Sequence, residues 1–353
     1  MNAGAAAAES LPRAWGPPPL HGVLRQEPED FQVEEILGYA ADGAGEHVLL
    51  TIRKIGANTA WVARQLAGFA GVDERAVSWA GRKDRHAVTT QAFSVHLPGR
   101  PDPAWSQFEV PGVAVLDAQR HGRKLKRGAL AGNRFLVRIR EARGDRDAIE
   151  ARLRQMRAQG VPNYFGSQRF GRHGDNLAAA RRMFGGRRVP RAERDMLLSA
   201  ARAELFNAVL GQRVRQDCWN AGLAGELWAL AGSRAWFGPQ AFDETLAQRL
   251  AAFDIAPSGP LWGRGPSPAG ADCGALEDAV AAEHREFAEG LAAAGLEQAR
   301  RALRLDLRAL QWTWPAPETL ELAFALPAGA YATAVAHELL EDDAARAASG
   351  EDG

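Results

Sequence analysis

A short loop of mixed charge is the stretch of this chain that most suggests chemistry. Its residues, 81–86, read Gly-Arg-Lys-Asp-Arg-His, so one carboxylate, that of Asp84, stands among three cations. Opposite charges nearby favour the ionised form of a carboxyl group. An ionised carboxylate can act as a nucleophile or a base at a sugar carbon or a pyrimidine ring. The alternative is a surface turn whose charges only pair with one another.

The middle of the chain is strongly basic, although the 353 residues carry no net charge. Between Arg120 and Arg194 there are 21 Lys and Arg against 6 Asp and Glu, whereas residues 269–353 hold 6 against 16. A segment this basic usually faces a polyanion. Its densest part is a cluster of four cations, Arg123, Lys124, Lys126 and Arg127. Such clusters contact backbone phosphates, although a solvated turn can have the same composition.

Aromatic and basic residues also occur together in a second motif, residues 163–171, which read Asn-Tyr-Phe-Gly-Ser-Gln-Arg-Phe-Gly. Aromatic rings stack on bases and guanidinium groups hold phosphates, which is how proteins bind folded RNA. Arg169 is the cation of this motif. The composition supports equally well a glycine-rich loop whose aromatic rings are buried in a core.

Several common chemistries have no support in the sequence. There is no glycine-rich phosphate loop, no dinucleotide-binding fingerprint, no His-Glu-x-x-His zinc motif and no Gly-x-Ser-x-Gly elbow. The two cysteines, Cys218 and Cys273, are far apart, which excludes a disulfide framework and a cysteine-type zinc site. No apolar run approaches the ~18 residues that span a bilayer, and no signal peptide is recognisable. We therefore expect a cytoplasmic protein without metal, nucleotide cofactor or membrane contact.

The first part of the chain has the alternating pattern of β-strands. Within residues 134–140, Phe135, Val137 and Ile139 point one way and the arginines between them point the other. This alternation predicts a sheet with one buried face and one basic face. The loop at 81–86 lies between two of the predicted strands. Strands are expected near residues 33–36, 47–53, 76–80, 87–97, 113–117 and 134–140.

From about Asp145 the spacing of apolar residues changes to that of amphipathic helices. The proline- and glycine-rich residues 257–270 predict a long loop. After Arg308 the alternation of strands returns. Helices are expected at residues 147–158, 176–184, 191–217, 243–253, 273–294 and 331–340, and a further strand at 320–326.

This order of strands, helices and strands predicts two domains, which agrees with the length of the chain. A strand-rich domain is expected from both ends of the chain, residues 21–161 and 305–345. A helix-rich domain, residues 162–304, is expected to be inserted between them. Residues 1–20 are rich in alanine and then in proline, and we expect them to form a disordered extension.

Five motifs together resemble the TruD family of tRNA pseudouridine synthases. They occur in the order of the family, with similar sequence between them, and they cover nearly the whole chain. They are residues 28–31, Pro-Glu-Asp-Phe; residues 81–91, Gly-Arg-Lys-Asp-Arg-His-Ala-Val-Thr-Thr-Gln; residues 128–135, Gly-Ala-Leu-Ala-Gly-Asn-Arg-Phe; residues 163–171; and residues 327–333, Pro-Ala-Gly-Ala-Tyr-Ala-Thr. Five such motifs in order are very hard to obtain by chance.

The resemblance implies an α+β fold. It consists of a pseudouridine synthase catalytic domain with a central, mostly antiparallel sheet, and a helix-rich inserted TruD-type domain. The resemblance also implies that Asp84 is the catalytic aspartate. Phe31, Asn133 and Tyr331 are implied to line the uridine pocket, although phenylalanine is more usual at the Tyr331 position and its hydroxyl is an addition. The other substrate-binding candidates are Arg25, where the family often has lysine, Lys83 and Gln91.

The implied activity is the isomerisation of a uridine in tRNA, uridine-13 by resemblance, to pseudouridine. The target base would be flipped out of its stack into an aromatic pocket. Asp84 could attack C1′, attack C6 or remove a ribose proton, and the sequence leaves these three routes open. We expect tRNA as the partner and a monomer as the working form. RNA contacts are expected at Arg123, Lys124, Lys126, Arg127 and Arg169.

Two other functions fit parts of the sequence. A non-catalytic tRNA-binding or tRNA-folding module would share the basic surface, but it would not need Asp84 in an intact loop. A small-molecule nucleoside enzyme would not need so many cations between Arg120 and Arg194.

Overall fold

The computed structural model describes residues 11–171 and 174–342, which form two compact units. The sheet unit comprises Pro19–Ala151, Leu307–Gly329 and the described residues from Leu340 on. The helical unit comprises the described residues up to Pro18, Arg152–Asp306 and Ala330–Leu339. The division therefore differs from the expected domains, 21–161 with 305–345 and 162–304. Residues 152–161, 305–306 and 330–339 belong to the helical unit, and residues 343–345 lie outside the described residues.

Ten strands in the described part of the chain form one sheet in the sheet unit. The main path of the sheet is β14-β15-β7-β2-β5-β3-β6, with β4 beside β5 and β1 beside both β7 and β16. Two of these pairs, β1–β16 and β2–β5, are parallel and the others are antiparallel, which confirms the mostly antiparallel sheet. The bounds are β1 Leu20–Leu24, β2 Phe31–Ile36, β3 His47–Lys54, β4 Val77–Trp79, β5 Val88–His96, β6 Val113–His121, β7 Gly132–Arg143, β14 Gln311–Ala316, β15 Thr319–Pro327 and β16 Leu340–Asp342.

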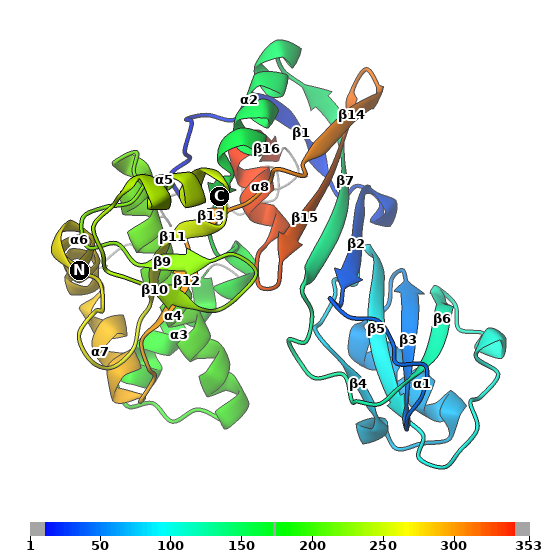
Figure 1. Ribbon diagram of the computed structural model, residues 1–353. Helices are drawn as coiled ribbons and strands as arrows, with labels where there is room; N and C mark the ends of the chain where they lie inside the picture. Colours follow the sequence, from blue (N-terminus) through cyan, green and yellow to red (C-terminus); the bar gives the residue numbers. More distant parts are fainter. Residues whose placement is uncertain (1–10, 172–173, 343–353) are drawn as a thin grey trace, which may run out of the picture. The chain divides into compact units, whose positions relative to one another are not determined.

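Strands from distant parts of the sequence meet in this sheet. β15 pairs with β7 from Thr319 opposite Arg140 to Pro327 opposite Gly132, and the two run side by side in Figure 1. The C-terminal part of the chain is thus bound into a sheet that the first half begins. All the strands expected from the sequence are present, and β1, β14 and β16 are additional.

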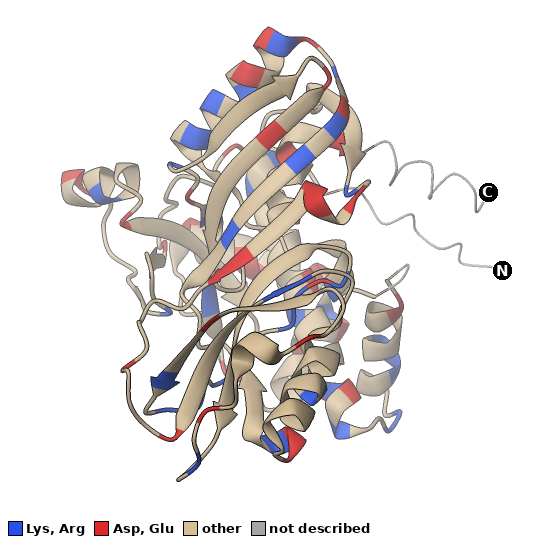
Figure 2. Cartoon of the chain, turned by 90° about the vertical axis from the view of Figure 1, so that its right-hand side faces the viewer, with Lys and Arg blue, Asp and Glu red and all other residues tan. Residues whose placement is uncertain are grey.

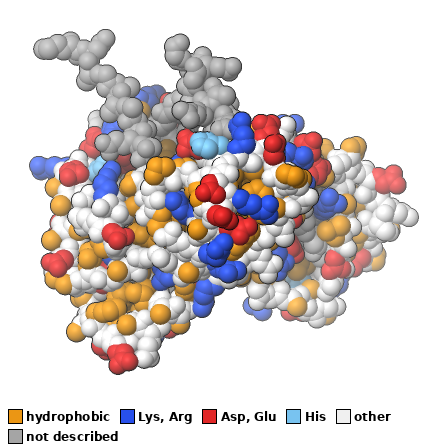
Figure 3. All heavy atoms as spheres, turned by 90° about the horizontal axis from the view of Figure 1, so that it is seen from above, with side chains coloured by type: hydrophobic (Ala, Val, Ile, Leu, Met, Phe, Trp, Pro, Cys, Tyr) orange, Lys and Arg blue, Asp and Glu red, His pale blue; other side chains and the backbone are white. Residues whose placement is uncertain are grey.

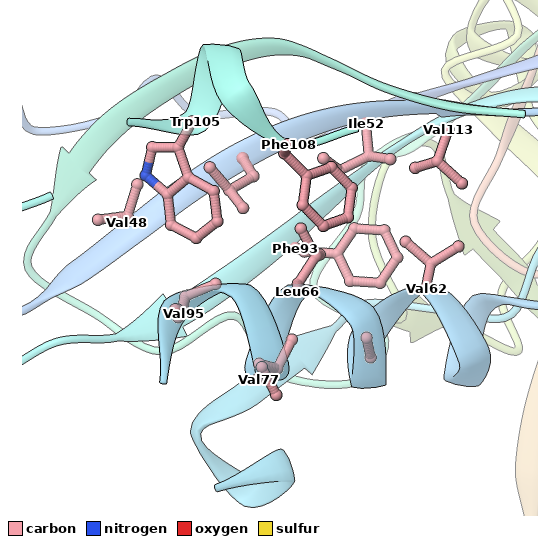
Figure 4. Close-up of a cluster of buried hydrophobic side chains, with 14 of the residues drawn as sticks. Val48, Ile52, Val62, Leu66, Val77, Phe93, Val95, Trp105, Phe108 and Val113 are labelled. Carbon is pink, nitrogen blue, oxygen red and sulfur yellow. The ribbon is translucent and has the colours of Figure 1, made fainter. Parts of the chain in front are cut away.

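The helix α1 (Thr59–Ala70) packs on the sheet over a continuous apolar core. Leu50 and Ile52 of β3 are fully buried, as are Val62 and Leu66 of α1. Figure 4 shows Phe93 of β5 lying between these strand and helix side chains. Alternate residues of a strand and every third or fourth residue of a helix share one face, which explains why these positions are apolar.

The two faces of β7 differ as the sequence predicts, but the second face is not simply basic. Phe135, Val137 and Ile139 are buried. The arginines of the other face each pair with a carboxylate: Arg134 with Glu34, Arg138 with Glu321 and Arg140 with Asp30. Figure 2 accordingly shows acidic and basic residues mixed along the strands. The prediction of a basic face is therefore wrong here, because neighbouring segments supply the opposite charges.

The helical unit combines helices with a smaller sheet. In the described part of the chain this sheet has four strands in the order β10-β9-β11-β12, and β8 pairs separately with β13. The helix α2 (Arg146–Gln159) contains the boundary between the units. The other bounds are β8 Val161–Pro162, α3 Asp175–Phe184, α4 Arg191–Arg215, β9 Trp228–Leu230, β10 Trp236–Phe237, α5 Glu244–Ala251, β11 Ile255–Leu261, α6 Ala271–Glu283, α7 Arg285–Ala293, β12 Ala299–Ala302, β13 Arg304–Leu305 and α8 Ala332–Leu339.

Two expectations for this region are wrong. The long loop predicted at 257–270 begins as a strand, because β11 pairs with β9 and β12 over residues that include two prolines. The single helix predicted at 273–294 is two helices. At His284 the backbone leaves the helical conformation, with φ −107° and ψ 35°, and α7 begins at the next residue.

The N-terminal residues that the structure describes are not a disordered extension. Leu11 and Trp15 pack against the core of the helical unit, and Trp15 lies edge-on to Trp219 with 5.9 Å between ring centres. The main-chain N–H of Ala14 donates to the carboxylate of Glu338. The expectation for residues 1–20 is therefore wrong from residue 11 on, because Leu11 and Trp15 are partly buried against that core. Residues 1–10 lie outside the described residues.

Candidate active site

The carboxylate of Asp84 lies on the loop 81–86, between β4 and β5 of the sheet unit. Its Oδ2 lies 3.2 Å from Nη1 of Arg25, and its Oδ1 accepts the main-chain N–H of His86 at 3.0 Å. Of the Asp84 side chain 31% is exposed, and of the Arg25 side chain 30%. Two donors therefore orient the carboxylate while part of it stays open to a ligand.

The loop is fixed from α1 and from β5. The main-chain N–H of Lys83 donates to the Thr59 hydroxyl at 3.1 Å, and that hydroxyl donates to Oε1 of Gln91 at 2.9 Å. Nε2 of Gln91 donates to the carbonyl of Gly81 at 3.2 Å. Because Gln91 is buried, this predicted substrate-binding residue lies behind the loop and holds it in place.

Lys83 also points into the protein. Its Nζ lies 2.5 Å from Oε1 of Glu35, and both side chains are almost completely buried. The other oxygen of Glu35 accepts the main-chain N–H of Ala92 at 3.0 Å. This predicted substrate-binding residue therefore forms a buried ion pair that ties the loop to β2 and β5.

Arg25 connects Asp84 to the predicted pocket residue Phe31. Its guanidinium carbon lies 4.1 Å from the centre of the Phe31 ring, a cation–π contact. Arg25 has the left-handed backbone conformation, φ 58°, which is uncommon for residues other than glycine. Phe31 is 7% exposed and packs edge-on against Phe135, with 6.1 Å between ring centres. The ring, the guanidinium and the carboxylate thus form one continuous row.

Asp30, the residue before Phe31, has a structural role in the motif at residues 28–31. Asp30 is fully buried, and its oxygens accept from Nε of Arg140 at 2.9 Å and from the main-chain N–H of Glu27 at 2.9 Å. These bonds fix the short helical turn Pro28–Asp30 against β7. They therefore fix the backbone position of Phe31 and the direction of its side chain.

Asn133 lies on the same face of the sheet as Phe31 and carries a hydrogen-bond acceptor that the described residues leave unused. It stands opposite Glu35 in the register of β2 with β7, so the two side chains are direct neighbours. Its Oδ1 is buried and has no hydrogen-bond partner among the described residues. A buried acceptor without a donor is unfavourable, and it is suited to receive an N–H from a ligand.

A further residue at this site, Lys54, was not predicted from the sequence. It lies at the end of β3 and is fully buried. Its Nζ donates to the main-chain carbonyl of Asp84 at 2.9 Å. Burial disfavours the charged ammonium and lowers the pKa of Lys54 to about 8, although the nearby Asp84 acts in the opposite direction. The sequence does contain a signal that could have identified this residue. Leu50, Ile52 and Lys54 occupy alternate positions, so the lysine lies on the side of the strand that is otherwise apolar.

Tyr331 and Arg169 lie together in the helical unit. Nη2 of Arg169 donates to the Tyr331 hydroxyl, and Nη1 donates to the Ser199 hydroxyl at 3.0 Å. The ring of Tyr331 lies 6.1 Å from that of Phe165. The Tyr331 hydroxyl therefore has a definite partner. Asp84 and the other predicted pocket residues belong to the sheet unit.

The remaining aromatic residues of the motif at 163–171 are largely structural. Tyr164 and Phe165 are buried, and Phe165 packs edge-on against Phe206 at 5.3 Å. A Cβ on Gly166 would meet Oγ1 of Thr333 at 2.7 Å, so glycine allows the close approach at the start of α8. For Tyr164 and Phe165, the buried-core interpretation of this motif is the correct one.

Comparison with known proteins decides the family. The family model for tRNA pseudouridine synthase D (TruD) matches residues 12–184 and 173–339. The chain belongs to the TruD family. The tRNA pseudouridine synthase D of Xanthomonas axonopodis pv. citri is 51% identical, over 93% of this chain and 94% of the relative. That of Methylococcus capsulatus is 50% identical, over 95% of both chains.

A solved structure shares the fold. It is that of a Methanosarcina mazei protein assigned as tRNA pseudouridine synthase D, with a TM-score of 0.71. The similarity covers 93% of this chain and 95% of that chain, at 20% sequence identity. The expected α+β fold is therefore confirmed.

The basic cluster of this TruD-family chain borders a shallow hollow of the sheet unit. The hollow has a volume of about 300 Å³ and is lined by Val77, Ser78, Trp79, Lys124, Leu125, Lys126 and Arg127. The segment runs beside β4, since the N–H of Gly128 donates to the carbonyl of Ala80 at 2.7 Å. Lys126 and Arg127 are exposed and have no ionic partner among the described residues. They contrast with the face in Figure 3, where basic and acidic side chains lie next to one another.

In residues 11–171 and 174–342, no group of three or more His, Cys, Asp and Glu side chains could hold a metal ion. Among the same residues, no helix is both long and apolar enough to cross a membrane.

Proposed function

We propose that this protein isomerises a uridine of tRNA, at position 13, to pseudouridine, with Asp84 as the catalytic carboxylate. Membership of the TruD family supports the reaction and the substrate class. The observation that carries the assignment of Asp84 is its geometry. It is a partly exposed carboxylate, oriented by Arg25 and the His86 N–H, on a loop that several elements hold in place.

The reaction conserves atoms and electrons. The bond between N1 of uracil and C1′ of ribose breaks, the base turns, and a bond forms between C5 and C1′. The hydrogen on C5 leaves as a proton, and N1 takes up a proton. Asp84 can serve by attacking C1′, by attacking C6 or by removing a ribose proton, and all three routes need an ionised carboxylate. Arg25 lies where it can orient this carboxylate.

Phe31 and Asn133 are the proposed uridine-binding residues of the sheet unit, and Tyr331 is the proposed one of the helical unit. Aromatic rings can replace the stacking that a flipped base loses, worth roughly 1–3 kcal/mol per base. The unpartnered Oδ1 of Asn133 can accept the N3–H of uracil. We assign Lys83 and Gln91 to holding the catalytic loop, because their polar atoms already bond within the protein.

The proposed RNA-contacting residues are Arg123, Lys124, Lys126 and Arg127. Arg169 already donates to Ser199 and Tyr331, so we assign it to positioning the Tyr331 ring. Each phosphate that a cation neutralises adds roughly −0.7 to −0.9 to the slope of log affinity against log salt. Replacing both Lys126 and Arg127 by alanine should make the slope for tRNA shallower by about one to two. An unchanged slope would remove this cluster from the RNA-binding surface.

Tritium release from tRNA labelled at C5 of uridine tests the function, because formation of the C5–C1′ bond displaces that hydrogen. The purified chain should release tritium, and the product should carry pseudouridine at position 13. A non-catalytic tRNA-binding module would bind the same tRNA and release none. Mapping pseudouridine in total RNA with and without the gene identifies the modified position. Pseudouridine at a different position would support the isomerase activity but contradict the assignment of position 13.

A further inference from the structure

Lys54 is a fully buried cation to which the proposed reaction assigns no role. The apolar side of β3 carries Leu50 and Ile52, both fully buried, and Lys54 continues this side at the end of the strand. Removing an ammonium group from water is strongly unfavourable unless good partners replace the water. An apolar side chain of similar length, such as methionine, would fill the same space without that cost.

The hydrogen bond of Lys54 is directed to the catalytic loop. Its Nζ donates to the carbonyl oxygen of Asp84 at 2.9 Å. The charged groups that act on the ammonium are Asp84, which favours its charged form, and Lys83, which opposes it. Lys83 is itself neutralised by Glu35 at 2.5 Å. The cation is thus placed against the main chain of the one residue whose side chain is proposed to react.

The other hydrogen bonds to the loop hold residues other than Asp84. Gly81 is held through its carbonyl by Gln91, and Lys83 through its N–H by Thr59. Arg85 exchanges two bonds with Gly56: its Nε donates to the Gly56 carbonyl at 3.0 Å, and its own carbonyl accepts the Gly56 N–H at 3.1 Å. Lys54 supplies the corresponding contact at Asp84, between these points.

We infer that Lys54 is a positioning residue, which fixes the backbone of Asp84 so that its carboxylate meets the flipped uridine in a productive orientation. This inference rests on the proposed role of Asp84. Displacing a reacting group by about 1 Å can cost roughly 100-fold in rate. Removing the Lys54 contact should therefore lower turnover without changing the surface that binds tRNA.

The test is Lys54→Met in the full chain, with single-turnover tritium release at saturating tRNA, tRNA affinity and thermal melting measured on one preparation. We expect turnover to fall on the order of 10- to 100-fold. The Kd for tRNA should stay within about threefold, and the melting temperature should be unchanged or higher, because a buried charge has been removed. Lys54→Gln, which keeps an N–H donor, should recover part of the lost turnover.

Arg53→Met is the matched control, since Arg53 is the exposed neighbour on the same strand, and its turnover at saturating tRNA should equal that of the wild type. Turnover of Lys54→Met within threefold of wild type would overturn the inference. So would a loss of activity that follows a fall in melting temperature, or failure of both Lys54 variants to fold, since either result makes Lys54 part of the fold alone. If Asp84→Asn keeps full turnover, the proposed function fails instead, whatever the Lys54 variants do.

Discussion

The ion pair at the candidate active site of the sheet unit and two ion pairs of the helical unit differ sharply in exposure. In the sheet unit, the Arg25–Asp84 pair leaves about a third of each side chain exposed, 30% and 31%. In the helical unit, the pairs Arg213–Glu226 and Arg300–Glu277 have 2.7 Å between charged atoms, and every one of the four side chains is only 1% exposed.

The buried pairs of the helical unit are also more completely bonded. Arg213 donates to the carbonyls of Cys218 and Ala221 as well as to Glu226. Arg300 likewise donates to the hydroxyl and the carbonyl of Ser258. A buried network of this kind fixes how its segments pack, because any partner left alone is strongly unfavourable. The exposed carboxylate of Asp84 has room for a substrate instead. Changes in the two units should therefore separate activity from stability.

Asp84→Asn should give the largest effect on activity. The amide keeps the shape of the side chain and removes the anion, so turnover should fall by ~10²–10⁴. The affinity for tRNA should stay within about threefold, because one charge among many contacts matters little. Tritium release and a binding isotherm on the same preparation measure both. Asp73→Asn, at an exposed aspartate of the same unit, is the control, and turnover of Asp84→Asn within tenfold of wild type would exclude the proposed role.

Arg213→Met should give the largest effect on stability. It leaves Glu226 buried without its partner, which costs about 3–5 kcal/mol of unfolding free energy. The double variant Arg213→Met, Glu226→Leu should recover most of this loss, because no uncompensated charge remains. Chemical unfolding measures the free energies, and tritium release per folded molecule should stay near that of wild type. A turnover defect in the folded double variant would break the distinction between the units.

Phe31 is both a packed side chain and a proposed uridine-binding residue, so its variants test whether stability and activity can be separated within the sheet unit. Phe31→Ala should lower the unfolding free energy by about 3 kcal/mol, because the ring is 7% exposed and packs on Phe135. Phe31→Leu keeps apolar volume and should cost less than about 1.5 kcal/mol. If the ring also stacks on the flipped uridine, Phe31→Leu should still lose turnover by an amount on the order of 1–3 kcal/mol. Full turnover of Phe31→Leu would make this ring a core residue only.

Glu338 should make the helical unit sensitive to pH. Its carboxyl is buried, which raises its pKa from the ordinary 4.5 to about 7, although the N–H of Ala14 and the charge of Arg152 act in the opposite direction. Because the folded-state pKa is the higher one, the stabilising contribution is complete below pH 4.5 and is lost as the pH rises through 7. The loss should reach at most about 3 kcal/mol, at ~1.4 kcal/mol per unit of pKa.

Urea unfolding between pH 4 and 8 measures this effect. Glu338→Gln should remove this part of the pH dependence and leave the tritium release of the folded protein unchanged. Equal slopes of unfolding free energy against pH for the variant and the wild type would show that Glu338 does not titrate in this range.

Tyr331→Phe should give the smallest effect. The ring that is proposed to stack on uridine remains, while the hydrogen bond from Arg169 is lost. A single hydrogen bond contributes about 0.5–1.5 kcal/mol to stability, and turnover should stay within about threefold. Tyr331→Ala, in contrast, should lower turnover as Phe31→Leu does. A loss of more than tenfold in Tyr331→Phe would show that the hydroxyl itself takes part in the site.

The local features of this protein could be predicted from its amino-acid sequence. Alternation predicted β7 and its buried residues Phe135 and Val137, and helical spacing predicted α4, because these patterns depend on neighbours in the chain. The sequence also singled out Asp84, and the five motifs pointed to the family that the comparisons show.

Other features depend on partners far apart in sequence, and these could not be predicted. The strand β11 forms despite its prolines, because β9 and β12 pair with it. The arginines of β7 are neutralised by carboxylates such as Glu321, almost two hundred residues away. Lys54 meets Asp84 only because the end of β3 and the loop 81–86 come together in the fold. Periodicity shows which way a side chain points, but the charge or donor that it meets there is set by long-range packing.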